Sequence, residues 1–93
     1  MQIEQTNTAL KGFFKAMEAA ERAGVMTYTW AGEHKMVIDH TEVSPEFEGK
    51  GIGKALVLAA VKFAREGQIK IVPVCSFAQN VFAKNADLQD ILF

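Results

Sequence analysis

The clearest pattern in the chain is a helical one from about Gly51 to Glu66. Apolar residues recur there at intervals of three and four and leave only a narrow polar side. Ile52, Leu56, Ala59 and Phe63 make the apolar side, and Lys54, Lys62 and Arg65 the polar one. Gly67 stands where a helix commonly ends. Because the polar side is so narrow, we expect this helix to pack against a sheet.

Two segments on either side of this helix have the composition of strands. Residues 35–43, KMVIDHTEV, end at Ser44 and Pro45, and residues 69–77, IKIVPVCSF, are rich in β-branched side chains. Strand, glycine loop, helix and strand make a right-handed crossover between two parallel strands. Pro73 has no amide hydrogen for a central ladder, so we expect an edge, a bulge or a splayed strand end there.

The first two dozen residues carry two conflicting signals. By propensity, residues 13–23, FFKAMEAAERA, favour a helix. Gly12 and Gly24 bracket that stretch, however, and a hairpin through AAERAG would place Phe14 beside Met26. The residues by themselves leave both interpretations open.

The remaining segments carry weaker patterns. Residues 26–30, MTYTW, alternate as a strand does and precede a turn at residues 31–35, AGEHK. Residues 78–92 predict a short helix followed by a turn or a second short helix. No repeat, linker or low-complexity stretch divides the chain, so we expect one domain over residues 1–93.

Composition narrows the classes of function. A chain of 93 residues buries only somewhat over ~60% of its unfolded surface, so we expect no large enclosed substrate cavity. With 49% hydrophobic residues and a net charge of −1, neither disorder nor a nucleic-acid partner is expected. The longest apolar run, residues 55–61, is far shorter than the ~20 residues that span a bilayer, and the N-terminus lacks a signal-peptide core. We therefore expect a cytoplasmic protein without a membrane partner.

A glycine-rich loop precedes the predicted helix. In residues 48–53, EGKGIG, the glycines Gly49, Gly51 and Gly53 leave backbone amides unshielded by side chains. A helix that begins there directs its unpaired first-turn N–H groups to the same point. Such a place attracts an anion, most often phosphate.

Two common phosphate-binding templates do not fit this loop. A P-loop requires a glycine where Glu48 stands and a serine or threonine where Ala55 stands. A dinucleotide fingerprint requires a small residue where Leu56 stands and an acidic residue at the end of the next strand. A tight strand-to-helix turn without any ligand also fits the glycines, so the loop alone leaves both interpretations open.

The neighbouring residues resemble one known family. The stretch IDHTEVSPEFEGKGIGKALV, followed about a dozen residues later by IVPVCSFA, resembles the GNAT superfamily of acetyl-CoA-dependent N-acetyltransferases, in particular its branch of very small, cysteine-containing members. The resemblance runs from about Tyr28 to Leu92. Its pyrophosphate loop usually begins with Gln or Arg, so Glu48 is a departure from the pattern.

The resemblance implies an α/β (α+β) protein with a minimal GNAT-like fold. That fold has an N-terminal antiparallel hairpin and strand, a glycine loop with a central helix, a splayed parallel strand and a short C-terminal helix. The resemblance therefore favours strand, turn and strand in residues 13–30, against their helix propensity, and we predict the hairpin.

The resemblance also implies acetyl-CoA, or CoA, as the cofactor. The implied contacts are Gly49, Lys50, Gly51, Ile52, Gly53 and Lys54 at the pyrophosphate, the backbone of Glu42 and Val43 along the pantetheine arm, and Asn80, Phe82 and Lys84 beside the arm or the adenine. Glu48 must then point away from the phosphates. Lys50 and Lys54 are equally well explained as solvated lysines, and Phe82 is better explained as a core residue.

Cys75 is the only cysteine, which excludes an intrachain disulfide and a multi-cysteine metal site, and we predict no metal. Without context such a thiol is usually inert. In the small GNAT branch, a cysteine at this place lies near the thioester and is proposed to take the acetyl group. His40, on the neighbouring strand, is the expected proton-transfer partner, with a packed sheet histidine as the alternative. Glu42 is a second candidate base, on the same face as His40 if no bulge intervenes.

We therefore predict an acetyltransferase that acts on an unidentified amine, directly or through an acetyl-cysteine. So short a chain lacks elements that enclose a substrate, which suggests a macromolecular, exposed or partner-supplied amine. One rival is a non-catalytic CoA- or acyl-CoA-binding module. Another is an interaction domain whose glycine loop is only a turn. The sequence leaves the oligomeric state open, and we favour a monomer.

Overall fold

A five-stranded sheet forms the frame of the molecule. The computed structural model describes all 93 residues. The strands β1 (Gln2–Asn7), β2 (Lys11–Glu18), β3 (Glu21–Trp30), β4 (Lys35–Val43) and β5 (Lys70–Pro73) lie side by side in chain order. The first four are antiparallel, and β5 is parallel to β4. The predicted parallel crossover is therefore confirmed.

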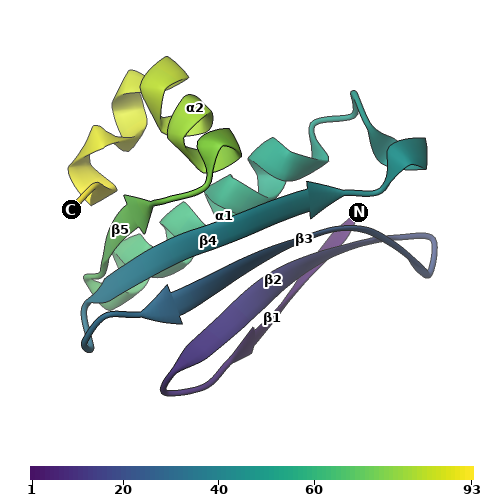
Figure 1. Cartoon of the computed structure of the whole chain (residues 1–93). Coiled ribbons are helices and arrows are strands. Elements are labelled where there is room, and N and C mark those ends of the chain that lie inside the picture. The colour runs from purple at the N-terminus through teal and green to yellow at the C-terminus, as the bar shows by residue number, and fades with distance from the viewer.

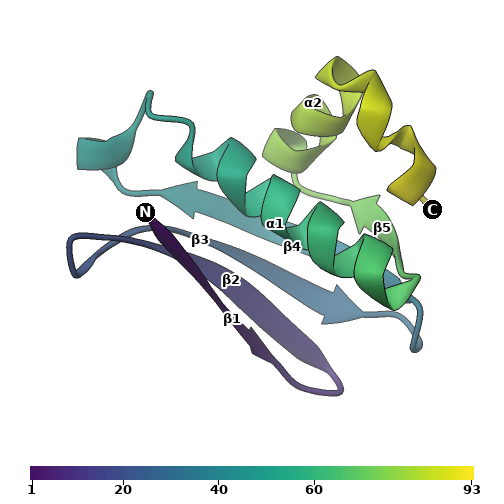
Figure 2. The ribbon, with the colours of Figure 1, turned by 180° about the vertical axis from the view of Figure 1, so that it is seen from behind.

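The helices cover one face of this sheet (Figures 1 and 2). Helix α1 (Ile52–Gly67) crosses that face, while α2 (Ser76–Lys84) and the 3-10 helix η2 (Ala86–Ile91) pack beside α1 near β5. A further 3-10 turn, η1 (Pro45–Phe47), follows β4. The opposite face of the sheet has no helix over it. None of the helices combines the length and the hydropathy that a membrane-spanning helix requires.

The N-terminal hairpin is confirmed. β2 pairs with β3, and Phe14 lies opposite Met26. The turn is shorter than the predicted residues 19–24, because it consists of Ala19 and Ala20 at φ angles of 49° and 69°. A two-residue hairpin turn with positive φ at both positions normally uses asparagine or glycine, so two alanines gave no turn signal.

Two other elements differ from the sequence prediction. β1 was not predicted, because five of its six residues are exposed and only Ile3 contacts the core. β5 ends at Pro73 rather than at residue 77, and Ser76 and Phe77 belong to α2. The reason is that Val74 and Cys75 both donate backbone hydrogen bonds to the Ile38 carbonyl, at 2.9 and 3.2 Å, which turns the chain out of the sheet.

A bulge in β4 changes which side chains face the helices. Thr27 pairs with His40 and Tyr28 with Ile38, so Asp39 is an extra residue in β4. Before the bulge, the buried Ile38 faces the helices; after it, Thr41 does. His40 therefore points to the uncovered face of the sheet.

The core is one cluster of 20 buried hydrophobic residues between the sheet and the helices. It contains no buried polar or charged residue. The C-terminal end joins this core because Leu92 forms a parallel bridge with Ile71 and the Phe93 amide donates to the Ile71 carbonyl at 2.9 Å. Arg65 of α1 holds η2 through Asp90, at 2.7 Å between Nη2 and Oδ1.

Candidate functional site

The glycine loop adopts a backbone that only glycine adopts easily. Gly49 and Gly51 have φ angles of 79° and 76°, and a Cβ atom on either would meet nothing within 4 Å. These two positions therefore require glycine for their conformation and not for lack of space. Gly51 is also the N-cap of α1, whose first turn contains no acidic residue. The unpaired amides at this helix end face an open approach.

Gly53 has a different role. It lies within α1, and a Cβ atom there would collide with the Phe77 ring of α2. The missing side chain thus lets α2 close against the first turn of α1. Gly53 shapes the wall of the site, whereas Gly49 and Gly51 shape the loop itself.

A cavity of about 480 Å³ opens in front of this loop. Its lining comes from the end of β4, from the loop with the first turn of α1, and from α2: Thr41, Val43, Phe47, Glu48, Gly49, Gly51, Ile52, Gly53, Lys54 and Phe77. Segments that are more than 30 residues apart in the chain therefore form one site.

The strands β4 and β5 separate beside this cavity. Their pairing runs from Lys35 and Lys70 to Ile38 and Pro73 and goes no further. Of the arrangements expected at Pro73, the structure shows an edge strand with a splayed end. From Asp39 to Val43, the outer edge of β4 has no strand beside it, so its backbone groups are accessible to an extended ligand.

Cys75 lies in the gap between the two strands, half-buried, as the N-cap of α2. Its Sγ atom accepts a hydrogen bond from the Ala78 amide and lies 3.4 Å from Thr41 Oγ1. The Ala78 amide, in the first turn of α2, thereby fixes the position of the sulfur. Thr41 could not be predicted from the sequence as a site residue, because only the bulge at Asp39 turns it toward Cys75.

His40 and Glu42 lie elsewhere. Their side chains contact each other on the uncovered face, at 3.6 Å between Nε2 and Oε2, and both are 64% exposed. The expectation that they share a face is confirmed, because the bulge precedes both. The structure does not bring His40 to Cys75, however, since Thr41 has the place at the sulfur.

Of the other residues predicted to contact the cofactor, one lines the cavity, three lie outside it and one is buried. Lys54 lines the cavity, whereas Lys50 lies with its Nζ 5.5 Å from the centre of the Phe47 ring and is not part of the lining. Asn80 lines a separate hollow on the surface of α2, and Lys84 is exposed at the end of that helix. Phe82 is only 2% exposed and packs in the core, which agrees with its alternative explanation as a core residue.

Glu48 also differs from expectation. Glu48 lines the cavity, whereas phosphate binding was expected to require that its side chain point away. Glu48 is exposed and forms no ion pair, so nothing holds its carboxylate in one orientation. Apart from this carboxylate, the lining suits a phosphate group, because it combines accessible glycine amides, the start of a helix and one lysine.

The parallel strands of this sheet splay apart, and a glycine loop at the start of a helix lies beside the splay. This combination is typical of acyltransferases. Residues 13–91 match the family model described as GCN5-related N-acetyl-transferase. The chain belongs to this family.

Individual relatives agree with this assignment. The chain is 34% identical over 61 residues to Protein NATD1 of Xenopus tropicalis, and 33% identical to Protein NATD1 of Homo sapiens. These alignments cover 66% of this chain and 56% and 54% of the two relatives, so the chain spans about half the length of the curated relatives it matches.

Solved structures share the fold. A GCN5-like protein of Staphylococcus aureus, solved by NMR, is 32% identical, with a TM-score of 0.75 over 99% of this chain and 87% of that one. Aminoglycoside N-acetyltransferase AAC(6')-Iy, solved with CoA, has a TM-score of 0.68 over 89% of this chain and 88% of that chain. At 14% identity, the second likeness concerns the fold alone.

Proposed function

We propose that the chain binds acetyl-CoA and transfers its acetyl group to an amine. The observation that carries the proposal is the loop with Gly49 and Gly51 at positive φ, at the start of α1 and beside the open edge of β4. A simple strand-to-helix turn needs neither two such residues nor a cavity in front of them. An anion at that point would meet backbone amides from the loop and the helix.

Different residues of the site would contact different parts of acetyl-CoA. The amides of residues 49–53 and the ammonium of Lys54 would hold the pyrophosphate. The backbone groups of Val43, which point to the unpaired edge of β4, would hold the pantetheine arm, whereas Glu42 directs its own backbone groups to Val25 of β3. When bound, acetyl-CoA supplies an acetyl group activated as a thioester.

One route to the product runs through Cys75. Its sulfur attacks the acetyl carbonyl carbon, the original carbon–sulfur bond breaks, and the thiol proton passes to the departing sulfur. This exchange of one thioester for another is nearly neutral in energy. The amine then attacks the acetylated Cys75, and the sulfur recovers a proton. Thr41 Oγ1, 3.4 Å from Sγ, would orient the thiol during these steps.

The other route is direct attack by the amine. An ammonium must lose a proton before its nitrogen attacks, so this route needs a base near the acceptor. His40 and Glu42 are paired on the uncovered face and stand on the strand that the cofactor would follow. From this face they could remove a proton from an acceptor that approaches it. They do not face the Cys75 sulfur, which Thr41 contacts instead.

The uncovered face of the sheet also indicates what kind of amine could be the acceptor. No helix covers this face of the sheet, and the His40 side chain is 64% exposed, so a small amine would gain little enclosure there. A macromolecular amine brings its own surface to the sheet. We therefore favour an exposed amine on a macromolecule as the acceptor, with the protein acting as a monomer.

Calorimetric titration with acetyl-CoA tests the cofactor site, and intact-mass analysis of the protein with acetyl-CoA tests transfer. Saturable binding with acetylation of Cys75, or of an added amine, supports the proposal. Binding without transfer to any amine identifies a non-catalytic acyl-CoA-binding module. Absence of binding identifies a domain in which the loop is only a turn.

A further inference from the structure

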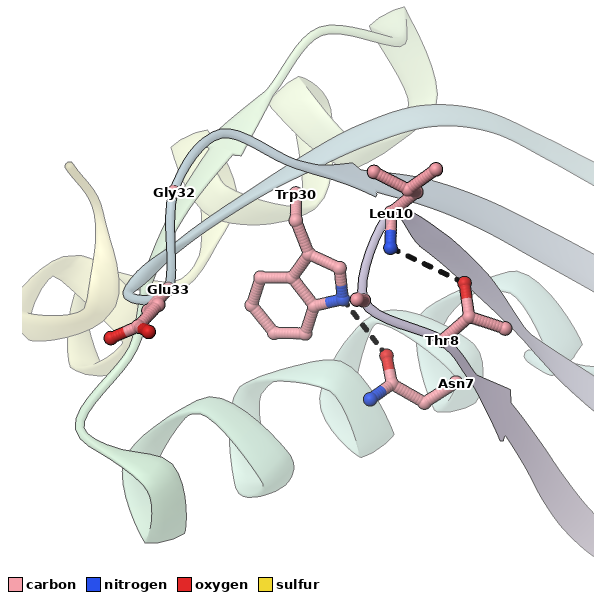
Figure 3. Close-up of a pocket in the computed structure, with 7 residues that line it drawn as sticks. Asn7, Thr8, Leu10, Trp30, Gly32 and Glu33 are labelled. Carbon is pink, nitrogen blue, oxygen red and sulfur yellow. Dashed lines mark hydrogen bonds between the residues drawn. The ribbon is translucent and has the colours of Figure 1, made fainter.

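A second cavity lies at the end of the sheet opposite the glycine loop. It has a volume of about 650 Å³ and is formed by the turn between β1 and β2 and the turn between β3 and β4. Its lining residues are Asn7, Thr8, Ala9, Leu10, Trp30, Gly32 and Glu33. Figure 3 shows the Trp30 indole in the middle of the cavity, with Asn7 and Glu33 on opposite sides of it.

A chain of hydrogen bonds fixes one wall of this cavity. Gln5 Nε2 donates to Tyr28 Oη at 2.9 Å, and Tyr28 Oη donates to Asn7 Oδ1 at 2.8 Å. Trp30 Nε1 donates to the same oxygen at 2.9 Å. Burial raises the pKa of Tyr28, so its hydroxyl keeps the proton that it donates.

This network determines which way the Asn7 amide faces. The indole N–H is only a donor, so the atom that it meets must be the oxygen of Asn7. Both bonds use the oxygen, so the Asn7 Nδ2 group is left without a hydrogen-bond acceptor in the protein. Because Asn7 lines the cavity, it offers an unused donor on an amide whose orientation is fixed.

The indole ring is held as firmly as the amide. Trp30 meets Tyr28 edge to face with 5.7 Å between ring centres, and Phe63 lies 6.2 Å away on α1. Because its N–H group is also engaged, the ring presents a steady aromatic surface to the cavity. Such a surface attracts organic cations.

The charge of the cavity has one sign. Glu33 is its only charged lining residue and forms no ion pair. The lysine that follows on the same turn, Lys35, is directed elsewhere, with its Nζ 3.8 Å from the centre of the Phe93 ring. A cation in the cavity would therefore meet a carboxylate and an indole, with no competing positive group among the lining residues.

We propose that this cavity binds a basic residue, lysine or arginine, of a polypeptide. Such a residue has a cationic end for Glu33, a hydrocarbon stem for the Trp30 ring and a backbone carbonyl for Asn7 Nδ2, in the order in which the cavity offers these groups (Figure 3). The site stands apart from the glycine loop and does not depend on the proposed acetyl transfer.

Trp30 is the only tryptophan of the chain, so its fluorescence reports on this site alone. The probes are Nα-acetyl-lysine amide and Nα-acetyl-arginine amide, with Nα-acetyl-norleucine amide as the neutral analogue and pentylamine as the cation without a carbonyl. We expect a saturable change with the two basic amides, weakened by salt, and at least threefold weaker binding of the other two probes. Free lysine distinguishes a free amino acid from a polypeptide residue, and we expect it to bind less tightly than the blocked amide.

Matched variants separate charge from shape. Glu33→Gln should weaken lysine-amide binding about threefold or more and leave the norleucine analogue unchanged. Glu21→Gln, an exposed carboxylate at the other end of β3, is the control and should change neither. Equal binding of the lysine and norleucine amides, an unaffected Glu33→Gln variant, or the absence of a saturable signal each overturns the proposal. Tighter binding of free lysine overturns the choice of a polypeptide. Acetyl-CoA titrations of the same variants measure the glycine-loop site separately, so a failure of one site is not mistaken for a failure of the other.

Discussion

Thr41 Oγ1 and Cys75 Sγ lie 3.4 Å apart across the gap where β4 and β5 separate. This contact exists because the bulge at Asp39 shifts the alternation of β4 by one residue, so that Thr41 rather than His40 faces the cysteine. The thiol and the histidine, expected to act as a pair, are thereby placed on opposite faces of the sheet. Cys75 and His40 are therefore tested separately.

Acetylation of Cys75 is the first prediction. With acetyl-CoA, the intact mass should rise by one acetyl group that hydroxylamine removes, and Cys75→Ala should abolish this label while it retains cofactor binding. Thr41→Val keeps the shape of the side chain but removes the hydroxyl, and it should slow labelling severalfold. Full-rate transfer to an amine by Cys75→Ala would show that the amine attacks directly.

His40→Ala should slow transfer to an amine by roughly 10²–10⁴, with cofactor affinity changed by only a few-fold, because a proton-transfer group does not anchor the cofactor. The side chain is 64% exposed, so we expect no more than about 0.5 kcal/mol loss of stability. Transfer rates, calorimetry and thermal unfolding measure the three quantities. A variant that unfolds would instead identify a structural histidine.

Gly51→Ala should weaken acetyl-CoA binding at least tenfold, because it places a methyl group at the proposed pyrophosphate site and opposes a φ of 76°. The strain of a positive φ should cost ~1 kcal/mol of stability. Gly32→Ala is a matched control, since Gly32 has a φ of 88° and equally free space but lies outside the cavity in front of the glycine loop. It should lose similar stability and keep its affinity; equal affinity in both variants would contradict the phosphate-loop assignment.

Glu48→Gln should tighten acetyl-CoA binding by about two- to fivefold, because it removes a negative charge from the lining of the cavity. The gain should shrink as salt is added. Glu46→Gln, an exposed carboxylate two residues away in η1 and outside the lining, is the control. Calorimetry at two salt concentrations measures the effect, and identical gains in both variants would indicate only a change in overall charge.

Acid should loosen the C-terminal segment. The hydrogen bond from Arg65 lowers the pKa of Asp90 from its ordinary value, so this pair adds stability above the unfolded pKa that is lost as the pH falls through the folded one. The loss belongs to the region below about pH 4. Asp90→Asn should reduce the acid sensitivity of η2, which hydrogen exchange of its amides can follow. Unchanged acid sensitivity would show that the pair contributes nothing measurable.

Local chemistry made several elements predictable from the sequence. The period of α1, the β-branched composition around Pro73 and the glycines of the loop each act over a few residues, so the crossover, the splay and the candidate cofactor loop could all be predicted. The Phe14–Met26 hairpin required more, because its own residues favour a helix and its turn uses two alanines at positive φ. Only family resemblance decided that segment in advance.

Tertiary structure decided which side chains meet. The bulge at Asp39 follows from how β4 fits against β3, and nothing within residues 35–43 indicates it, yet it determines that Thr41 faces Cys75 and His40 does not. The burial of Phe82 likewise depends on how α2 packs on α1, because an aromatic residue on a short helix can face either the core or a ligand. A sequence specifies its local periods directly, whereas register and packing depend on partners that are distant in the chain.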